Sequence, residues 1–173
     1  MNNRVNRLTF KAQVEQRHEA NPLLKISGDA ALVHRGVLRS LVMACPDGCG
    51  ELLTINLDAR AGKAWRAYGS HEELSVFPSV WRETGCKSHF ILWRSKIYWC
   101  DWGDELDTPI DDVVDRVRGH LSNELALYID IADALQLVPW AVLSACHRLV
   151  REGAAQEGKN KLGGHFRLES STR

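Results

Sequence analysis

Hydrophobic and polar positions follow strand-like spacing through the first part of the chain and helical spacing after it. Two apolar runs, 30–34 and 37–43, are separated by Arg35 and Gly36. Short apolar runs on either side of a glycine-containing turn are typical of a β-hairpin. We therefore expect a hairpin here, with its second strand leading into a turn that begins at Cys45.

Further strands are expected over 51–57, 65–68 and 74–81. The first of these alternates apolar and polar residues with the period of two that a strand requires. Pro78 cannot donate a ladder hydrogen bond, so it should lie at an edge or a bend. Residues 90–93 and 97–100 form the clearest hairpin of the chain, and its geometry places His89 or Phe90 across from Cys100.

The two ends of this β-rich part differ from it in composition. Residues 1–25 are polar and irregular, so we expect an N-terminal arm with a short helix over 11–20. Acidic residues cluster with Gly103 and Pro109 between 101 and 109, which predicts a linker and a domain boundary near 105.

Helical periodicity begins after Pro109. Helices are expected over 110–121, 127–137 and 140–151, with Pro139 in the first turn of the third. A two-stranded flap, 154–156 and 166–168, then flanks a Gly- and Lys-rich tip. This order is the outline of a winged helix-turn-helix. The fold class is therefore α+β: a zinc-stabilised antiparallel β domain over 26–105, followed by a small winged-helix domain over 106–173.

Charge changes this picture only locally. The chain has 22 Lys and Arg against 22 Asp and Glu, which argues against a protein that coats nucleic acid or an anionic membrane. From Pro139 onward six basic residues face three acidic ones. The helix over 140–151, together with Lys159 and Lys161, could therefore contact DNA or, equally well, a protein partner.

No apolar run of about 18 residues and no apolar leader is present, so we expect a cytoplasmic protein without a membrane partner. In that reducing compartment the five cysteines should be metal ligands, buried thiols or nucleophiles rather than disulfides.

Two cysteine-bearing turns have the pattern of a structural zinc site. Cys45 and Cys49 enclose Pro-Asp-Gly, and Cys86 precedes His89 by the spacing of a common zinc knuckle. The fourth ligand is open at this point, because the spacing favours His89 whereas the hairpin allows Cys100. The alternative is a metal-free core of buried thiols.

The choice of fourth ligand decides whether His89 is available as a general base. If Cys100 completes the metal site, His89 can accept a proton from the hydroxyl of Ser79 or of Ser88. Asp101 or Asp104 could then orient the imidazole. If His89 binds the metal, no such pair exists.

Several tryptophans belong to the same part of the chain. At least three of them are expected in the core, and others could line a groove for an extended peptide. They are Trp65, Trp81, Trp93, Trp99 and Trp102.

Four motifs together resemble a family of small bacterial proteins of formerly unknown function: Gly-Val-Leu-Arg-Ser-Leu at 36–41, Cys-Pro-Asp-Gly-Cys-Gly at 45–50, Phe-Pro-Ser-Val at 77–80 and Gly-Cys-Lys-Ser-His-Phe at 85–90. The resemblance covers residues 26–101. Members are encoded beside ubiquitin-like proteins and their activating and conjugating enzymes, in gene clusters linked to phage defence.

This resemblance implies a role in a ubiquitin-like pathway, as the peptidase that trims or removes the modifier. The motifs carry over onto Ser79 in the proline-serine motif and onto Ser88 and His89 in the cysteine-x-serine-histidine motif.

The sequence is thus interpreted as a serine-type hydrolase acting on a ubiquitin-like protein, with Ser79 as nucleophile and His89 as base. A structural zinc ion is assigned to Cys45, Cys49, Cys86 and Cys100. Two alternatives remain: a non-catalytic zinc-binding adaptor or ligase-like factor of the same pathway, and a winged-helix DNA-binding regulator.

Overall fold

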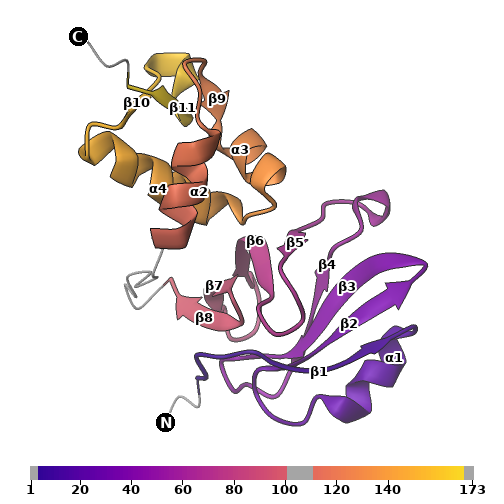
Figure 1. The fold of residues 1–173 in the computed structure, drawn as a ribbon. Coiled ribbons are helices and arrows are strands. Elements are labelled where there is room, and N and C mark those ends of the chain that lie inside the picture. Colours follow the sequence, from indigo (N-terminus) through magenta and orange to yellow (C-terminus); the bar gives the residue numbers. More distant parts are fainter. Residues whose placement is uncertain (1–3, 101–110, 170–173) are drawn as a thin grey trace. The chain divides into compact units, whose positions relative to one another are not determined.

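The computed structural model describes residues 4–100 and 111–169. The chain divides into two compact units, Met1–Leu106 and Asp107–Arg173 (Figure 1). The acidic linker expected over 101–109 lies outside the described residues. The class is α+β, as predicted, with mostly antiparallel strand pairing and four α-helices in the described parts.

The first unit contains a four-stranded sheet of order β1-β2-β3-β4. Its strands are β1 (Thr9–Val14), β2 (Asp29–Arg35), β3 (Val37–Ala44) and β4 (Leu52–Asn56). The predicted hairpin is confirmed: β2 and β3 pair antiparallel, and Gly36 takes the positive φ of 72° that the tight turn requires.

The N-terminal residues differ from the expected arm and helix. Residues 9–14 form β1, which pairs parallel with β2, so this sheet is mixed rather than wholly antiparallel. Phe10, Ala12 and Val14 alternate with polar positions, which is strand periodicity. The helix expected over 11–20 is reduced to α1 (Arg17–Ala20), followed by the 3-10 turn η1 (Asn21–Leu23).

A second four-stranded sheet has the order β5-β6-β7-β8. Its strands are β5 (Arg66–Tyr68), β6 (Ser75–Trp81), β7 (His89–Trp93) and β8 (Lys96–Trp99), and the 3-10 turn η2 (Ala59–Ala61) precedes them. The predicted β7–β8 hairpin is confirmed. Arg94 and Ser95, at φ 46° and 59°, form its two-residue turn, the left-handed geometry that matches strand twist.

Buried side chains of both sheets form one hydrophobic core. Leu41 and Met43 from β3 belong to it together with Phe90 and Leu92 from β7 and Trp99 from β8. The first sheet is buried on its other side as well, where Val33 and Val42 pack with Ala20 and Leu24 from the α1–η1 segment. Inward residues of the second sheet are therefore fixed by packing, while the alternate positions face outward.

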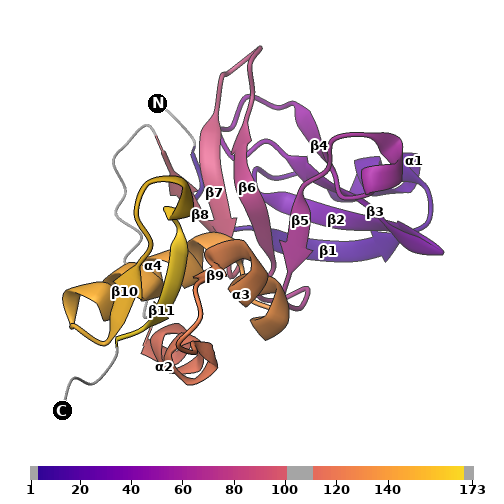
Figure 2. The same cartoon turned by 90° about the horizontal axis from the view of Figure 1, so that it is seen from above.

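The second unit contains three helices and a three-stranded sheet of order β10-β11-β9 (Figure 2). Its elements are α2 (Asp111–His120), β9 (Ala126–Leu127), α3 (Tyr128–Leu135), α4 (Pro139–Arg151), β10 (Ala155–Glu157), η3 (Asn160–Leu162) and β11 (His165–Leu168). The three predicted helices and the two flap strands are present, and Pro139 opens α4 as expected. The short strand β9 was not predicted.

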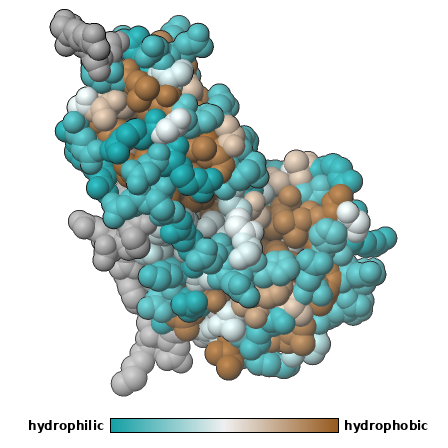
Figure 3. Space-filling view, in the orientation of Figure 1, coloured by the Kyte–Doolittle hydropathy of each residue, from teal (hydrophilic) through white to brown (hydrophobic). Residues whose placement is uncertain are grey.

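No single helix in the described ranges is long and apolar enough to cross a membrane; α3 and α4 pass that test only as a pair bent by 115°. The face drawn in Figure 3 is a mixture of hydrophilic residues and separate hydrophobic patches. Among the described residues, the exposed large hydrophobic side chains are Leu23, Ile26, Val37, Trp81 and Leu162.

Candidate active site

A serine and a histidine meet on adjacent strands of the second sheet. Ser79 lies on β6 and His89 on β7, and the register pairs His89 with Trp81. The Nε2 atom of His89 is 3.0 Å from the Oγ atom of Ser79, which is hydrogen-bonding distance. The two side chains assigned to catalysis from the sequence are thus in contact. This arrangement allows the imidazole to accept the hydroxyl proton.

A bulge in β6 presents Ser79. The β6–β7 register shifts between Val76, which pairs with Leu92, and Val80, which pairs with Phe90. Three residues of β6, 77–79, therefore lie opposite the single residue Ile91. Pro78 sits in this bulge, next to a cis peptide bond. It lies in a central strand, but at an interruption of the ladder where its missing N–H costs no hydrogen bond.

Trp65 holds the backbone of the bulge. Its indole N–H donates to the carbonyl oxygen of Ser79 at 3.2 Å. The backbone N–H of Trp65 donates in turn to the carbonyl of Asn56, at the end of β4, at 2.8 Å. The pairing of β6 with β5 ends at Phe77. At Ser79, two residues further on, the donor to the backbone carbonyl is therefore a side chain, the Trp65 indole. In the sequence Trp65 is one of several indoles, and no motif there indicates this role.

Ser88, the alternative nucleophile, has different neighbours. Its side chain is fully buried, and its hydroxyl lies 3.8 Å from the sulfur of Cys45. Among the described residues no acceptor contacts the second ring nitrogen of His89. Asp101 and Asp104, the expected third group, lie outside the described residues, as does Trp102.

Three cysteines from the predicted zinc site lie together. The sulfur atoms of Cys45, Cys49 and Cys86 are within 4.8 Å of one another, and those of Cys45 and Cys86 are 3.6 Å apart. Tetrahedral zinc–thiolate bonds of 2.3 Å place two sulfurs roughly 3.8 Å apart. The donor set therefore fits a metal ion that prefers thiolates.

Of the four predicted zinc ligands, the structure brings three cysteines together but not Cys100. Cys100 is not a member of this group of close ligand atoms, and neither is His89. Cys100 instead donates its backbone N–H to the carbonyl of His89 at 3.0 Å, in the position across the hairpin that the sequence predicted.

An arginine that the sequence analysis did not single out contacts the thiol cluster. The guanidinium of Arg82 donates to the sulfur of Cys86 at 3.2 Å and to that of Cys49 at 3.6 Å. It also forms an ion pair with Glu51, which, with the Cys86 contact, raises the pKa of Arg82. A cation beside sulfur ligands stabilises their thiolate form. No local pattern in the sequence marks Arg82 as a partner of the thiols.

The thiols differ in acidity. Burial raises the pKa of the Cys45 thiol to about 12. Burial also opposes ionisation of Cys86, but hydrogen bonds from Ser88, and then from Cys45 and Cys49, lower the pKa of Cys86 to about 7. Cys86 therefore ionises more readily than Cys45. The fifth cysteine, Cys146, is buried in the second unit.

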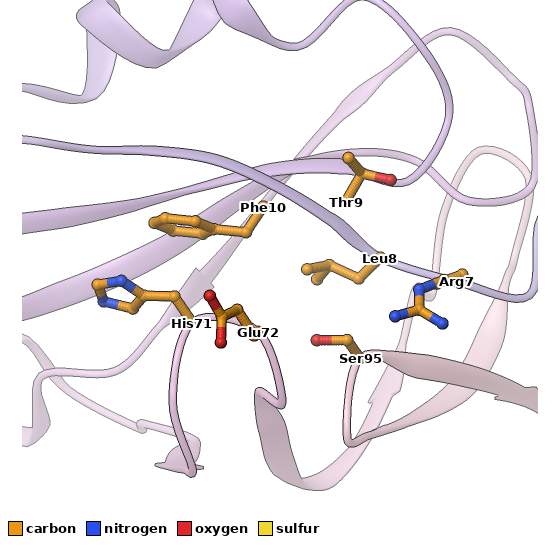
Figure 4. Close-up of a pocket in the computed structure, with 7 residues that line it drawn as sticks. All are labelled: Arg7, Leu8, Thr9, Phe10, His71, Glu72 and Ser95. Atoms are coloured by element: carbon orange, nitrogen blue, oxygen red, sulfur yellow. The ribbon is translucent and has the colours of Figure 1, made fainter.

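A hollow elsewhere in the first unit does not contain these groups. It has a volume of about 350 Å³, and the rings of Phe10 and His71 stack in it at 4.4 Å between centroids (Figure 4). The residues that line it are Arg7, Leu8, Thr9, Phe10, His71, Glu72 and Ser95. Ser79 and His89 lie outside it, on the outward side of the second sheet.

The fold and the contacts define an α+β protein with a Ser–His pair on β6 and β7 and a three-thiol cluster that includes Cys86 from the connection between these strands. The sequence model of one protein family, described as bacterial ubiquitination-like system serine protease (BubE), matches residues 13–100, just over half of the chain. The chain belongs to this family. The predicted association with bacterial ubiquitin-like systems is thereby confirmed. No significant match was found among curated proteins or among solved structures.

Proposed function

We propose that this protein is a serine-type peptidase that trims or removes a ubiquitin-like modifier. The observation that carries the proposal is the 3.0 Å contact between Ser79 Oγ and His89 Nε2 in a chain of the BubE family. Ser79 would attack the carbonyl carbon of the scissile bond while His89 takes its proton at Nε2. His89 would then give that proton to the leaving nitrogen as the scissile bond breaks. Water would next bond to the acyl carbon while His89 takes its proton, and the Ser79 oxygen would leave and recover that proton from His89.

The partners that follow are a ubiquitin-like protein and its conjugating enzymes. The family description supports the pathway, and the cytoplasm and antiviral defence are the setting that we propose for it. An adaptor without catalytic activity is the alternative in the same pathway. It would bind the same partners, but it would not require the Ser79–His89 contact.

We propose that the thiol cluster holds a structural zinc ion. Cys45, Cys49 and Cys86 would supply three ligands, and Cys100 is our candidate for the fourth. The contact of His89 with Ser79 supports leaving the imidazole off the metal. A bound ion would cross-link the turn after β3 to the segment between β6 and β7. Metal content of Cys100→Ala and of His89→Ala tests this assignment, since only loss of a true ligand should lower zinc occupancy.

For the second unit we propose a winged helix that docks a protein. The order α2-β9-α3-α4-β10-β11 with an antiparallel three-stranded sheet supports the winged helix. Arg148 on α4 is paired with Asp111 at 2.7 Å and with Glu152 at 3.0 Å. Arg118 also pairs with Glu152. These ion pairs offset the positive charge that DNA phosphates would need, so a DNA-binding regulator is the less favoured function.

Cleavage of a ubiquitin-like protein with a C-terminal extension tests the peptidase. Wild type should release the extension, and Ser79→Ala and His89→Ala should each reduce the rate at least about 1,000-fold while staying folded. Ser70→Ala, which alters an exposed serine in a loop, is the matched control and should keep full activity. A fluorophosphonate probe should label Ser79, identified by mass spectrometry. If wild type is as inert as Ser79→Ala in both assays, the protein is not a serine hydrolase.

A further inference from the structure

Trp81 is an exposed indole beside the Ser–His pair. Its side chain lies on β6, and 63% of the residue is exposed. Among the described residues it is the one aromatic side chain in the group of exposed large hydrophobics, the others being aliphatic. Isolated exposed aliphatic residues are ordinary on protein surfaces. An exposed tryptophan next to a reactive pair is not, because an indole gains so much from being covered.

The strand geometry places the indole and the hydroxyl on either side of the same imidazole. Residues 79 and 81 are two apart on β6, so their side chains share the outward face. His89 is the cross-strand partner of Trp81, and the two ring centroids are 5.9 Å apart. The Nε2 atom of His89 nevertheless reaches Ser79. The imidazole therefore extends from the level of Trp81 toward Ser79.

The direction of the imidazole, from Trp81 toward Ser79, indicates where the acyl part and the leaving-group part of a substrate would lie. The acyl carbon must bond to Ser79 Oγ, whereas the leaving nitrogen must receive its proton from Nε2 of His89. The leaving nitrogen is therefore held on the His89 side of Ser79. The chain that continues from it passes over the imidazole toward Trp81.

We propose that Trp81 binds the leaving-group segment of the substrate and makes the site selective for an extended polypeptide there. This inference rests on the proposed peptidase function and names a specificity determinant within it. The indole offers a flat apolar surface at low entropic cost, which suits a peptide backbone with varied side chains. Binding there adds affinity for long leaving groups and contributes nothing for short ones.

Two substrates with the same acyl part test the proposal. One is the ubiquitin-like protein with a C-terminal peptide extension, and the other is the same protein as a C-terminal methyl ester. Trp81→Ala should lower kcat/KM for the extended substrate at least about 10-fold, through a higher KM, and change hydrolysis of the ester less than about twofold. Trp81→Phe should retain most of the difference between the substrates. Ile26→Ala, at an exposed hydrophobic residue elsewhere in this unit, should change neither rate.

The outcomes separate this inference from the proposed function. Equal losses on both substrates would mean that Trp81 supports the Ser79–His89 pair instead of binding the leaving group, and no loss on either would mean that it binds nothing. A change in sedimentation of Trp81→Ala would assign the indole to a contact between copies. Each of these overturns the inference while wild type still labels Ser79 with fluorophosphonate. Absence of that labelling in wild type overturns the peptidase function and this inference together.

Discussion

Replacing Trp65 with phenylalanine should impair Ser79 without changing any group that reacts. The phenyl ring keeps most of the packing of the indole but lacks the N–H that donates to the Ser79 carbonyl at 3.2 Å. Ser79 lies in the bulge of β6, where Pro78 has no N–H and the register with β7 is shifted. Because the β6–β7 pairing is interrupted between Val76 and Val80, loss of this bond should give the serine side chain freedom to leave the imidazole.

The structure sets the size of the effect. A partly buried hydrogen bond between neutral groups is worth about 0.5–1.5 kcal/mol. If all of it acts on the alignment of Ser79, the rate should fall by about 2-fold to about 10-fold, since 1.36 kcal/mol corresponds to tenfold. The loss should appear in kcat with KM unchanged, because the Trp65 indole bonds the backbone of the nucleophile and is given no contact with the substrate.

Fluorophosphonate labelling of Ser79 measures this directly, since the probe reports nucleophile reactivity without a bound polypeptide. Trp99→Phe is a matched control: the indole of Trp99 donates to the carbonyl of Val5 at the same 3.2 Å. It should cost at least as much stability and leave the labelling rate of folded protein within about twofold. Equal labelling rates for Trp65→Phe and wild type would refute the reasoning, as would equal slowing by Trp99→Phe.

Four further substitutions test other parts of the structure. Cys86→Ser should lose bound zinc in native mass spectrometry, whereas Cys146→Ala, outside the cluster, should keep it. The bonds from Arg60, then Arg39, lower the pKa of Asp58 below its ordinary 3.8, so they stabilise the fold fully above that pH. As the pH falls below 3.8, wild type should lose thermal stability faster than Asp58→Asn. Gly28→Ala should destabilise by more than about 1 kcal/mol, because φ is 86° and the new Cβ would lie 2.5 Å from a carbonyl oxygen. Gly119→Ala, in helix α2 with no described atom within 4 Å, should instead raise the melting temperature. Denaturant and thermal unfolding measure the last three.

Local periodicity predicted most elements because their signals are short-range. Gly36 and the Arg94–Ser95 turn marked both hairpins, and Pro139 marked the start of α4. The strand at 9–14 was missed although its residues alternate as in a strand, because its partner, β2, is parallel and separated from it by α1. Parallel pairing leaves no turn signal between the strands that it joins.

The site residues that belong to sequence motifs could be predicted. Cys45, Cys49 and Cys86 were found by spacing, and Ser79 and His89 by resemblance. The contacts of Trp65, Arg82 and Glu51 with these groups could not be found in that way. They depend on the bulge in β6 and on how the segment after Trp81 turns, which no local pattern in the sequence determines.

The thiol cluster and the Ser–His pair share one stretch of chain. Residues 82–88 join β6, which carries Ser79, to β7, which begins at His89. Arg82 closes this connection by donating its backbone N–H to the carbonyl of Ser88 at 2.9 Å, and its guanidinium reaches Cys86 within the same loop. Because the loop is short and bonded at both ends, it also limits how far the ends of the two strands can separate. The sulfur contacts of Arg82 therefore bear on the spacing of Ser79 and His89, although, among the described residues, the group of close ligand atoms is limited to the three thiols and does not include His89.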